Sequence, residues 1–173
     1  MENQVSSKSI ILNYGLYLGI ISILISLTLY ATGNHLQPHW SISILNIAVM
    51  TIMIVLGMTK FKLGNGGFMS WGQAVKIGVG LTMISTIIVI VYNQIFMNFI
   101  EPDFMNQMTA VQEQNWVDQG MTSEQIEGAK EMMKKFQGPL ISSAIGLVAA
   151  AFFSFIISAI AGAIMKQSAE EQY

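Results

Sequence analysis

The sequence predicts an all-α membrane protein: a bundle of four transmembrane helices, with an extramembrane helical hairpin between the third and fourth spans. Its 173 residues are 53% hydrophobic and 10% charged, with a mean hydropathy of +0.54, which is too apolar for an ordinary soluble domain. Four blocks also lack every Asp, Glu, Lys, Arg and His: Ile10–Tyr30, Ser41–Thr59, Ile77–Ile100 and Pro139–Met165. A helix needs roughly 20 residues to cross a hydrocarbon core about 30 Å thick, so we expect four crossings.

We expect one membrane domain over residues 1–173. Its parts should be spans at about 10–30, 41–59, 74–100 and 139–165, a cytoplasmic turn at 60–73 and an outer helical loop at 101–138. The first block is a retained span rather than a signal peptide, because it exceeds the usual apolar core of such a peptide and no small-x-small cleavage site follows Tyr30.

Lysine positions predict the orientation. The connection from Ala31 to Trp40 holds no Lys, whereas five lysines flank the spans on the opposite side: Lys8, Lys60, Lys62, Lys76 and Lys166. By the positive-inside rule both termini should be cytoplasmic. Three more lysines near the fourth span, at positions 130, 134 and 135, oppose this bias.

The connection between the second and third spans contains a Gly-Asn-Gly-Gly turn at residues 64–67, flanked by short apolar/polar alternation. This pattern predicts a tight hairpin across 60–70. Ser70 and Gln73 then form a capping box, which predicts that the third helix begins near Trp71. Phe61, Phe68 and Trp71 on this side, and Tyr30, Trp40, Phe96 and Phe99 on the other, are expected to be interfacial anchors.

The loop at 101–138 carries seven acidic residues against three lysines. Apolar positions between Phe104 and Val117 favour a first helix that ends at Gly120. Thr122 and Gln125 make a capping box for a second helix, which Gly138-Pro139 closes. The apolar stripe of this hairpin could rest on the membrane interface, pack on the companion helix, or receive a partner.

Small residues mark candidate helix-packing faces. The fourth span has six of them, each four apart, and the first span has a Gly-x-x-x-Gly pair; the predicted packing residues are Gly15, Gly19, Ser142, Gly146, Ala150, Ser154, Ser158 and Gly162. A shorter column at Gly78, Thr82 and Thr86 lies in the third span. Small residues let helices approach closely in lipid, where packing rather than water drives association. They predict internal packing, self-association or contact with a membrane partner.

Asn13, Asn46, Asn93 and Gln94 place amide side chains within the spans. Such groups commonly hydrogen-bond across helices. A cavity lined by Asn46, Asn93, Tyr92 or the serines of the fourth span would instead indicate a small-solute transporter or channel subunit. The four uncharged blocks hold no Asp, Glu, Lys, Arg or His, so coupling to protons or sodium lacks its usual participant.

We expect no enzyme, and no catalytic, cofactor-binding or metal-binding residues. His35 and His39 are four apart, but Pro38 lies between them and no Cys, Asp or Glu is near in sequence. Clustering of Glu101 or Asp103 with either His would favour a membrane enzyme, whereas a separation above about 10 Å would leave no acid/base pair.

The order of these features resembles a four-span bacterial membrane protein family of unknown function that is widespread in Bacteroidetes. The resemblance rests on Lys60-Phe-Lys, on Asn65-Gly-Gly-Phe-Met-Ser-Trp-Gly-Gln-Ala74, on Glu101-Pro-Asp-Phe104 and on Gly120-Met-Thr-Ser-Glu-Gln-Ile-Glu127. It implies a location in the bacterial inner membrane and transfers no functional residues.

The sequence therefore favours a non-enzymatic interaction or assembly component, with a solute transporter or channel subunit as the alternative. Its partners should be the lipid bilayer and a membrane protein or a second copy of the chain. Nucleic acid is excluded as a partner, because a net charge of -2 leaves no basic excess to neutralise phosphates.

Overall fold

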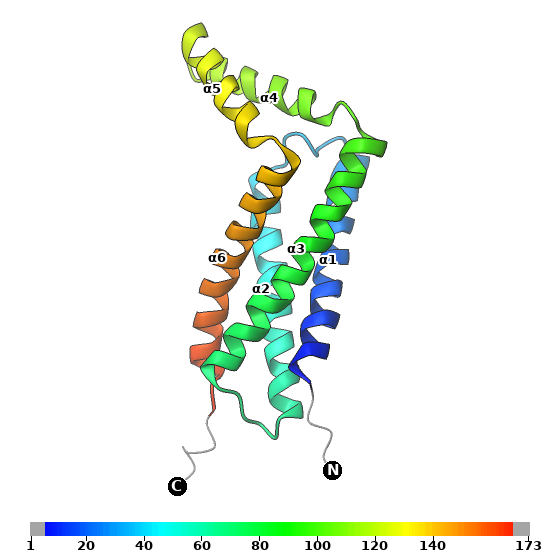
Figure 1. Ribbon diagram of the computed structural model, residues 1–173, viewed down its shortest axis with the longest axis vertical. Helices are drawn as coiled ribbons and strands as arrows, with labels where there is room; N and C mark the ends of the chain where they lie inside the picture. Colours follow the sequence, from blue (N-terminus) through cyan, green and yellow to red (C-terminus); the bar gives the residue numbers. More distant parts are fainter. Residues whose placement is uncertain (1–5, 168–173) are drawn as a thin grey trace.

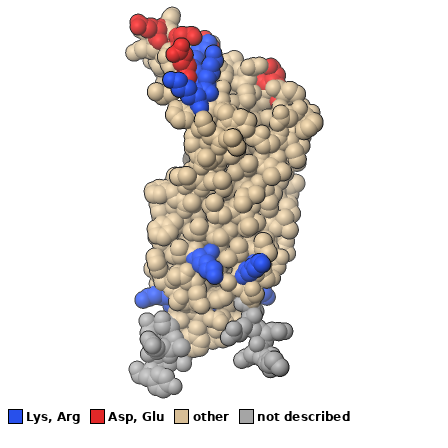
Figure 2. Space-filling view, in the orientation of Figure 1, with Lys and Arg blue, Asp and Glu red and all other residues tan. Residues whose placement is uncertain are grey.

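The computed structural model describes residues 6–167, and it is all-helical as the sequence predicts. The elements in order are α1 (Ser7–Ala31), α2 (Trp40–Gly64), α3 (Trp71–Ile95), the π-helical turn η1 (Phe96–Ile100), α4 (Phe104–Asp118), α5 (Ser123–Phe136) and α6 (Pro139–Met165). The four helices α1, α2, α3 with η1, and α6 are long and apolar enough to cross a membrane. In Figure 2 the coloured, charged side chains gather toward the two ends of the molecule, with an uncharged zone between them.

Helix α3 is the central element, since it packs along both α1 and α6 (Figure 1). We call the end where α1 begins and α6 ends the base, and the end that carries α4 and α5 the top. At the base an antiparallel bridge joins Met69 to Gln167, through N–H···O distances of 3.1 and 2.9 Å. Lys62 also donates to the Met165 carbonyl there, at 3.1 Å.

The helix starts follow the predicted caps. Ser70 accepts a hydrogen bond from the Gln73 N–H and the Gln73 side chain accepts one from the Ser70 N–H, so α3 begins at Trp71. Thr122 and Gln125 make the same reciprocal pair before α5. These short-range signals were readable because each is complete within four residues.

The predicted tight hairpin across 60–70 is wrong over its first half. Residues 60–64 continue α2, and the chain reverses only afterwards, through Gly66 and Gly67 with φ of 66° and 89°. The Gly67 N–H donates back to the Lys62 carbonyl at 2.8 Å, and the Asn65 N–H donates to the same carbonyl at 3.2 Å, so this carbonyl at the helix end is satisfied. Helix propagation therefore outweighs the short alternation that suggested a strand.

The hydrophobic core occupies only the base half of the bundle. Its buried members lie at positions 10–18 of α1, 53–61 of α2 and 74–81 of α3, together with Met69. In α6 the buried residues are Ser154, Ser158 and Gly162, again near the base. Phe61 and Phe96 are each 6% exposed, so their expected role as interfacial anchors is wrong; Phe61 belongs to this core.

Close contacts at small residues hold α3 against its neighbours in this half. A Cβ placed on Gly162 would lie 2.8 Å from the Ala74 Cβ, and one on Gly78 would lie 2.8 Å from the Ser158 Cβ. On the other side of α3, a Cβ on Gly15 would lie 2.7 Å from the Ile84 Cβ. Gly19 is next in the same seam, with Ile88 at 3.1 Å. A larger residue at Gly162, Gly78 or Gly15 would force the neighbouring atoms to shift, and one at Gly19 would require Ile88 to give way slightly.

The column of small residues on α6 divides into two parts. Its base part, Ser154 to Gly162, is packed against α3. Its top part is not, because a Cβ on Gly146 would meet nothing within 4 Å, and Ser142 is exposed. Figure 1 shows the same geometry: α3 and α6 lie side by side near the base and diverge toward the top.

We predict that substitution by leucine is costly in the base part of this column and nearly neutral in the top part. Ser154→Leu should destabilise the fold by about 1–3 kcal/mol, because its side chain is fully buried against neighbouring helices and the new volume must displace them. Gly146→Leu should cost less than about 0.5 kcal/mol, since it enters open space. Unfolding by SDS from mild-detergent micelles measures both; equal losses for the two variants would contradict the divided column.

Candidate functional site

A cavity of about 520 Å³ occupies the top half of the bundle, where the core is missing. We call it the polar cavity. It is lined by Leu18, Ser22, Asn46, Met50, Thr82, Ser85, Thr86, Val89, Ile90, Asn93, Gln94, Met97, Ser142, Ser143, Gly146 and Ala150. These residues come from α1, α2, α3, η1 and α6. Nine of them are polar, and no described lining residue is Asp, Glu, Lys, Arg or His.

The hydroxyl groups in this lining are partly committed to the helices that carry them. Ser22 donates to the Leu18 carbonyl at 2.9 Å, Thr82 to the Gly78 carbonyl at 2.9 Å and Thr86 to the Thr82 carbonyl at 2.8 Å. Each hydroxyl oxygen keeps its lone pairs after this donation. These hydroxyl oxygens can therefore still accept hydrogen bonds from a molecule in the cavity.

The amide groups in the lining are uncommitted. Within residues 6–167 the side chains of Asn46, Asn93 and Gln94 make no hydrogen bond to protein. A side-chain amide both donates and accepts, and it is costly to leave unpaired in an apolar medium. Asn46 is exposed and Asn93 and Gln94 are partly exposed, so the three amides are available to bond water or a solute.

A smaller cavity of about 260 Å³ continues the polar cavity toward the top. The two share Ser22, Asn46, Asn93 and Met97, and the smaller one extends to His35. Buried core side chains such as Leu81 and Ser154 close the bundle below. The site is thus a pocket that is shut at the base and leads toward the top.

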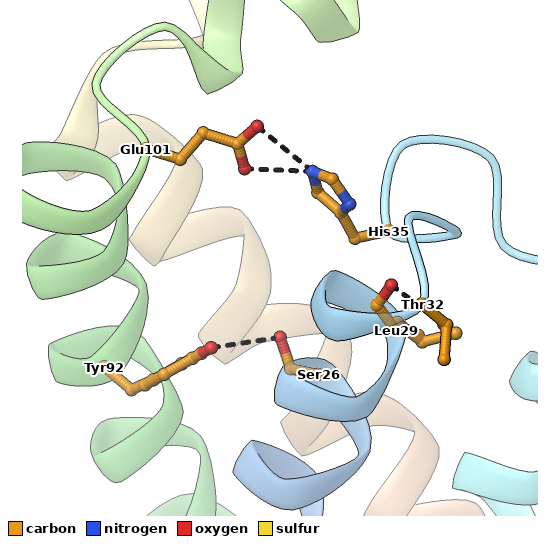
Figure 3. A network of polar contacts seen from close by, with 6 residues as sticks. All are labelled: Ser26, Leu29, Thr32, His35, Tyr92 and Glu101. Atoms are coloured by element: carbon orange, nitrogen blue, oxygen red, sulfur yellow. Dashed lines mark hydrogen bonds and ion pairs between the residues drawn. The ribbon is translucent and has the colours of Figure 1, made fainter.

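His35 and Glu101 form a pair at this upper cavity (Figure 3). The His35 Nε2 lies 2.9 Å from Glu101 Oε2 and 3.2 Å from Oε1, and the two side chains are 15% and 13% exposed. His35 comes from the α1–α2 loop, whereas Glu101 directly follows η1. The pair therefore ties two segments that are 66 residues apart in sequence.

Aromatic rings surround this pair. The His35 ring stacks on Phe104, with centroids 6.0 Å apart and planes at 25°, and it meets Tyr30 edge-on at 5.1 Å. Phe96 contacts the rings of Tyr30 and Phe104 at 5.1 and 5.8 Å. Below this pair in Figure 3, the hydroxyls of Tyr92 and Ser26 lie 3.4 Å apart and link α3 to α1. The top of α1 is therefore braced against α3 and η1.

The structure brings together several residues that the sequence marked separately. Asn46, Asn93 and Ser142 line one cavity, the arrangement that favours the solute-binding alternative. Tyr92 does not line it and contacts Ser26 instead. Thr82 and Thr86 were expected to form a packing groove, and both line the cavity. Ser85 was missed; no sequence signal distinguishes it from other serines in apolar helices.

The predicted packing residues fall into two groups. Gly15, Gly19, Ser154, Ser158 and Gly162 lie in close contact with neighbouring helices or are buried. Ser142, Gly146 and Ala150 line the polar cavity. The regular spacing of the column could not reveal this division, because the side chains look alike in sequence and only the helix crossing separates them.

The histidines do not act together. His39 caps α2, where its Nδ1 accepts from the Ser41 N–H at 3.3 Å, whereas His35 pairs with Glu101. Glu101 and His35 thus meet the distance condition set for an acid/base pair. Among the described residues, no group of three or more His, Cys, Asp or Glu is placed to hold a metal ion.

A sequence model for the family described as "Protein of unknown function (DUF4199)" matches residues 13–167, which is most of the chain. The chain belongs to the DUF4199 family. No curated protein and no solved structure matches it. The region shared with DUF4199 includes every residue that lines the polar cavity and both members of the His35–Glu101 pair.

We predict that His35 and Glu101 stabilise the fold as a coupled pair. Glu101→Ala should cost about 1–3 kcal/mol, because it leaves the largely buried imidazole without a partner. A double-mutant cycle with His35→Ala should return a coupling of about 0.5–3 kcal/mol in the same SDS unfolding assay. Glu127→Ala removes the same charge from an exposed position on α5 and is the control. Additive losses would mean that the contact contributes nothing.

Proposed function

We propose that this protein binds a small uncharged solute in the polar cavity, as a transporter or a channel subunit. The cavity itself is the observation that carries the proposal. Nine polar side chains surround about 520 Å³ of space between helices that are long and apolar enough to cross a membrane. Ligand pockets for small molecules usually measure about 300–1,000 Å³ and combine apolar walls with a few polar groups.

The free-energy cost of placing polar groups inside a membrane bundle supports this proposal. Polar groups facing hydrocarbon without partners are expensive, and a bundle used only for support could fill the same space with leucine. The top halves of α3 and α6 instead keep Asn93, Gln94 and Ser143 around an open volume. Since no described lining residue carries a formal charge, the solute should be uncharged as well, because a charge there would lack a counter-ion.

We also propose that the base faces the cytoplasm of a bacterial cell and that the protein resides in the inner membrane. The five flanking lysines support this orientation, because four of them lie at the base ends of α1, α2 and α3 and the fifth, Lys166, directly follows α6. The polar cavity then leads toward the outer side. α4 and α5 would form an extramembrane helical hairpin at the outer surface.

The charge pattern of α4 and α5 supports an aqueous location. Lys130 of α5 lies 3.0 Å from Glu113 of α4, and hydrogen bonding and attraction by that carboxylate raise the pKa of Lys130. Gln137 donates to the Thr109 hydroxyl at 3.3 Å. Both contacts join α4 to α5 or to its C-cap. The pair at Lys130 is solvent-exposed, so it orients the helices more than it stabilises them.

The outward face of α6 favours a second candidate, an interaction or assembly role. It carries a shallow apolar depression lined by Ala144, Ile145, Val148, Ala149, Phe152 and Phe153. Two alanines beside two phenylalanines make a surface into which another helix can pack. The occupant would be a second copy or another membrane protein. We assign no reaction to His35 and Glu101, whose contact joins two segments of the backbone.

Cysteine accessibility tests the solute-binding proposal. The chain has no cysteine, so Ser143→Cys in the cavity wall and Ile145→Cys on the outward face each report on one position. Methanethiosulfonates react with the thiolate, which a cysteine forms only where water reaches it. 2-Hydroxyethyl methanethiosulfonate should therefore modify the cysteine in the cavity wall at least about tenfold faster than the cysteine on the outward face. Reconstituted protein in phosphatidylcholine vesicles is the sample, and mass spectrometry measures the adduct. Equal, slow modification at both positions would show a dry interior and overturn the proposal.

Native co-purification tests the assembly candidate. In mild detergent, the wild-type chain should elute with a second copy or with a defined membrane protein, and Ala149→Trp should remove that species by filling the depression on α6. Gly146→Trp is the matched control, since it adds the same side chain on the cavity face of the same helix. A chain that elutes alone in every case would contradict an assembly role.

A further inference from the structure

A second, larger hollow adjoins the polar cavity beneath α4 and α5. It has a volume of about 630 Å³, and we call it the methionine groove. Its apolar walls are Met97, Phe104, Met105, Met108, Met133 and Phe136. Methionine is unbranched and flexible, so a wall of four such side chains accommodates hydrocarbon of varied shape. Figure 2 shows the molecule hollowed below the projecting end of α4 and α5.

The groove and the polar cavity are neighbours. Gln94, Met97 and Ser142 line both, so these three side chains lie where the two volumes meet. Met97 also borders the upper cavity at His35. It belongs to η1, and π-helical turns are frequent at functional sites. A single molecule that contacts Met97 would have polar surroundings on one side and apolar surroundings on the other.

We propose that the ligand of the polar cavity is a bilayer amphiphile with an uncharged, hydroxyl-bearing head and one flexible hydrocarbon chain. The head occupies the polar cavity and the chain occupies the methionine groove. This inference rests on the proposed function and specifies its ligand class. A compact polar solute would leave the methionine groove unused, whereas a plain hydrocarbon would leave the amides of Asn46, Asn93 and Gln94 unpaired.

The hydrogen-bonding pattern specifies the head. Ser22, Thr82 and Thr86 already donate to backbone carbonyls, so their oxygens favour a ligand that donates, as a hydroxyl does. The nearby ionisable side chains are paired with one another, His35 with Glu101 and Lys130 with Glu113. No described residue that lines the cavity or the groove offers a counter-ion to a phosphate or a carboxylate.

The groove is accessible from the side on which a lipid would enter. Phe136, which lines it, is 52% exposed, and the neighbouring Met132 and Leu140 are 63% and 87% exposed. These residues surround the junction of α5 with α6, where the apolar helix meets the amphipathic one. A lipid hydrocarbon chain that enters here moves from the apolar bilayer into an apolar groove and gains little preference for either. The specificity of binding therefore comes from the head in the polar cavity.

Photolabelling with a monoolein analogue that carries a diazirine in its acyl chain tests this proposal. The full-length protein is reconstituted in phosphatidylcholine nanodiscs, and labelled peptides are mapped by mass spectrometry. We expect saturable labelling within 104–108 and 133–137. Excess monoolein should compete, whereas oleate and glycerol should compete at least about tenfold less well, because one carries an uncompensated charge and the other lacks a chain.

Variants locate the ligand. Met97→Trp fills the junction of the two hollows and should reduce saturable labelling at least about tenfold, whereas Ile141→Trp, on an exposed face of α6 outside both, should leave it unchanged. Met133→Gln, in the part of the groove wall that α5 supplies, should also reduce saturable labelling and serves if the first variant misfolds. Labelling that is not saturable, or that Met97→Trp and Met133→Gln leave intact, would overturn the proposal.

The cavity thiol separates this inference from the function on which it rests. If Ser143→Cys reacts readily but chain labelling is not saturable, the amphiphile is wrong and the solute-binding function stands. If the thiol is also inert, both are wrong. Saturable labelling confined to Val148 and its neighbours on the outward face would likewise contradict the proposal and indicate an ordinary lipid contact.

Discussion

The close approach of α3 to α6 at the base is the contact on which the rest of the structure depends. Gly78 meets Ser158 and Ala74 meets Gly162, at distances that leave no room for a larger residue. In lipid, such contacts replace the hydrophobic effect as the source of helix association. Two helices that touch closely at one end and cross at an angle must separate at the other. The packed base therefore determines where the polar cavity opens.

The two sides of the cavity differ in how firmly they are held. On the α1 side, His35 with Glu101 and Tyr92 with Ser26 join α1 and its loop to α3 and η1, and a cluster of aromatic rings supports them. On the α6 side, the corresponding level carries Gly146, where an added Cβ would meet nothing within 4 Å, and the exposed Ser142. A ligand between α3 and α6 would thus contact one fixed wall and one that is free to adjust, as binding and release both require.

Short sequence patterns predicted the local structure well, but they did not predict the contacts between segments that are far apart in the sequence. The uncharged blocks predicted four long apolar helices, and both capping boxes located a helix start. The sequence offered the pairing of His35 with Glu101 only as a possibility, because whether the two meet depends on how a loop and a π-helical turn come together across 66 residues. Nor could the α6 column show which serines pack and which line a cavity, since that division follows from the crossing of α3 with α6.

The most direct test of this account is a crystal structure of the protein grown from a lipid mesophase, at a resolution that shows ordered water. We expect water or a ligand head hydrogen-bonded to Asn46, Asn93 and Gln94, and no solvent between α3 and α6 below Ser154. An interior in which α2 and α6 close on α3 at the top, with these amides bonded to one another and no space between them, would contradict the account.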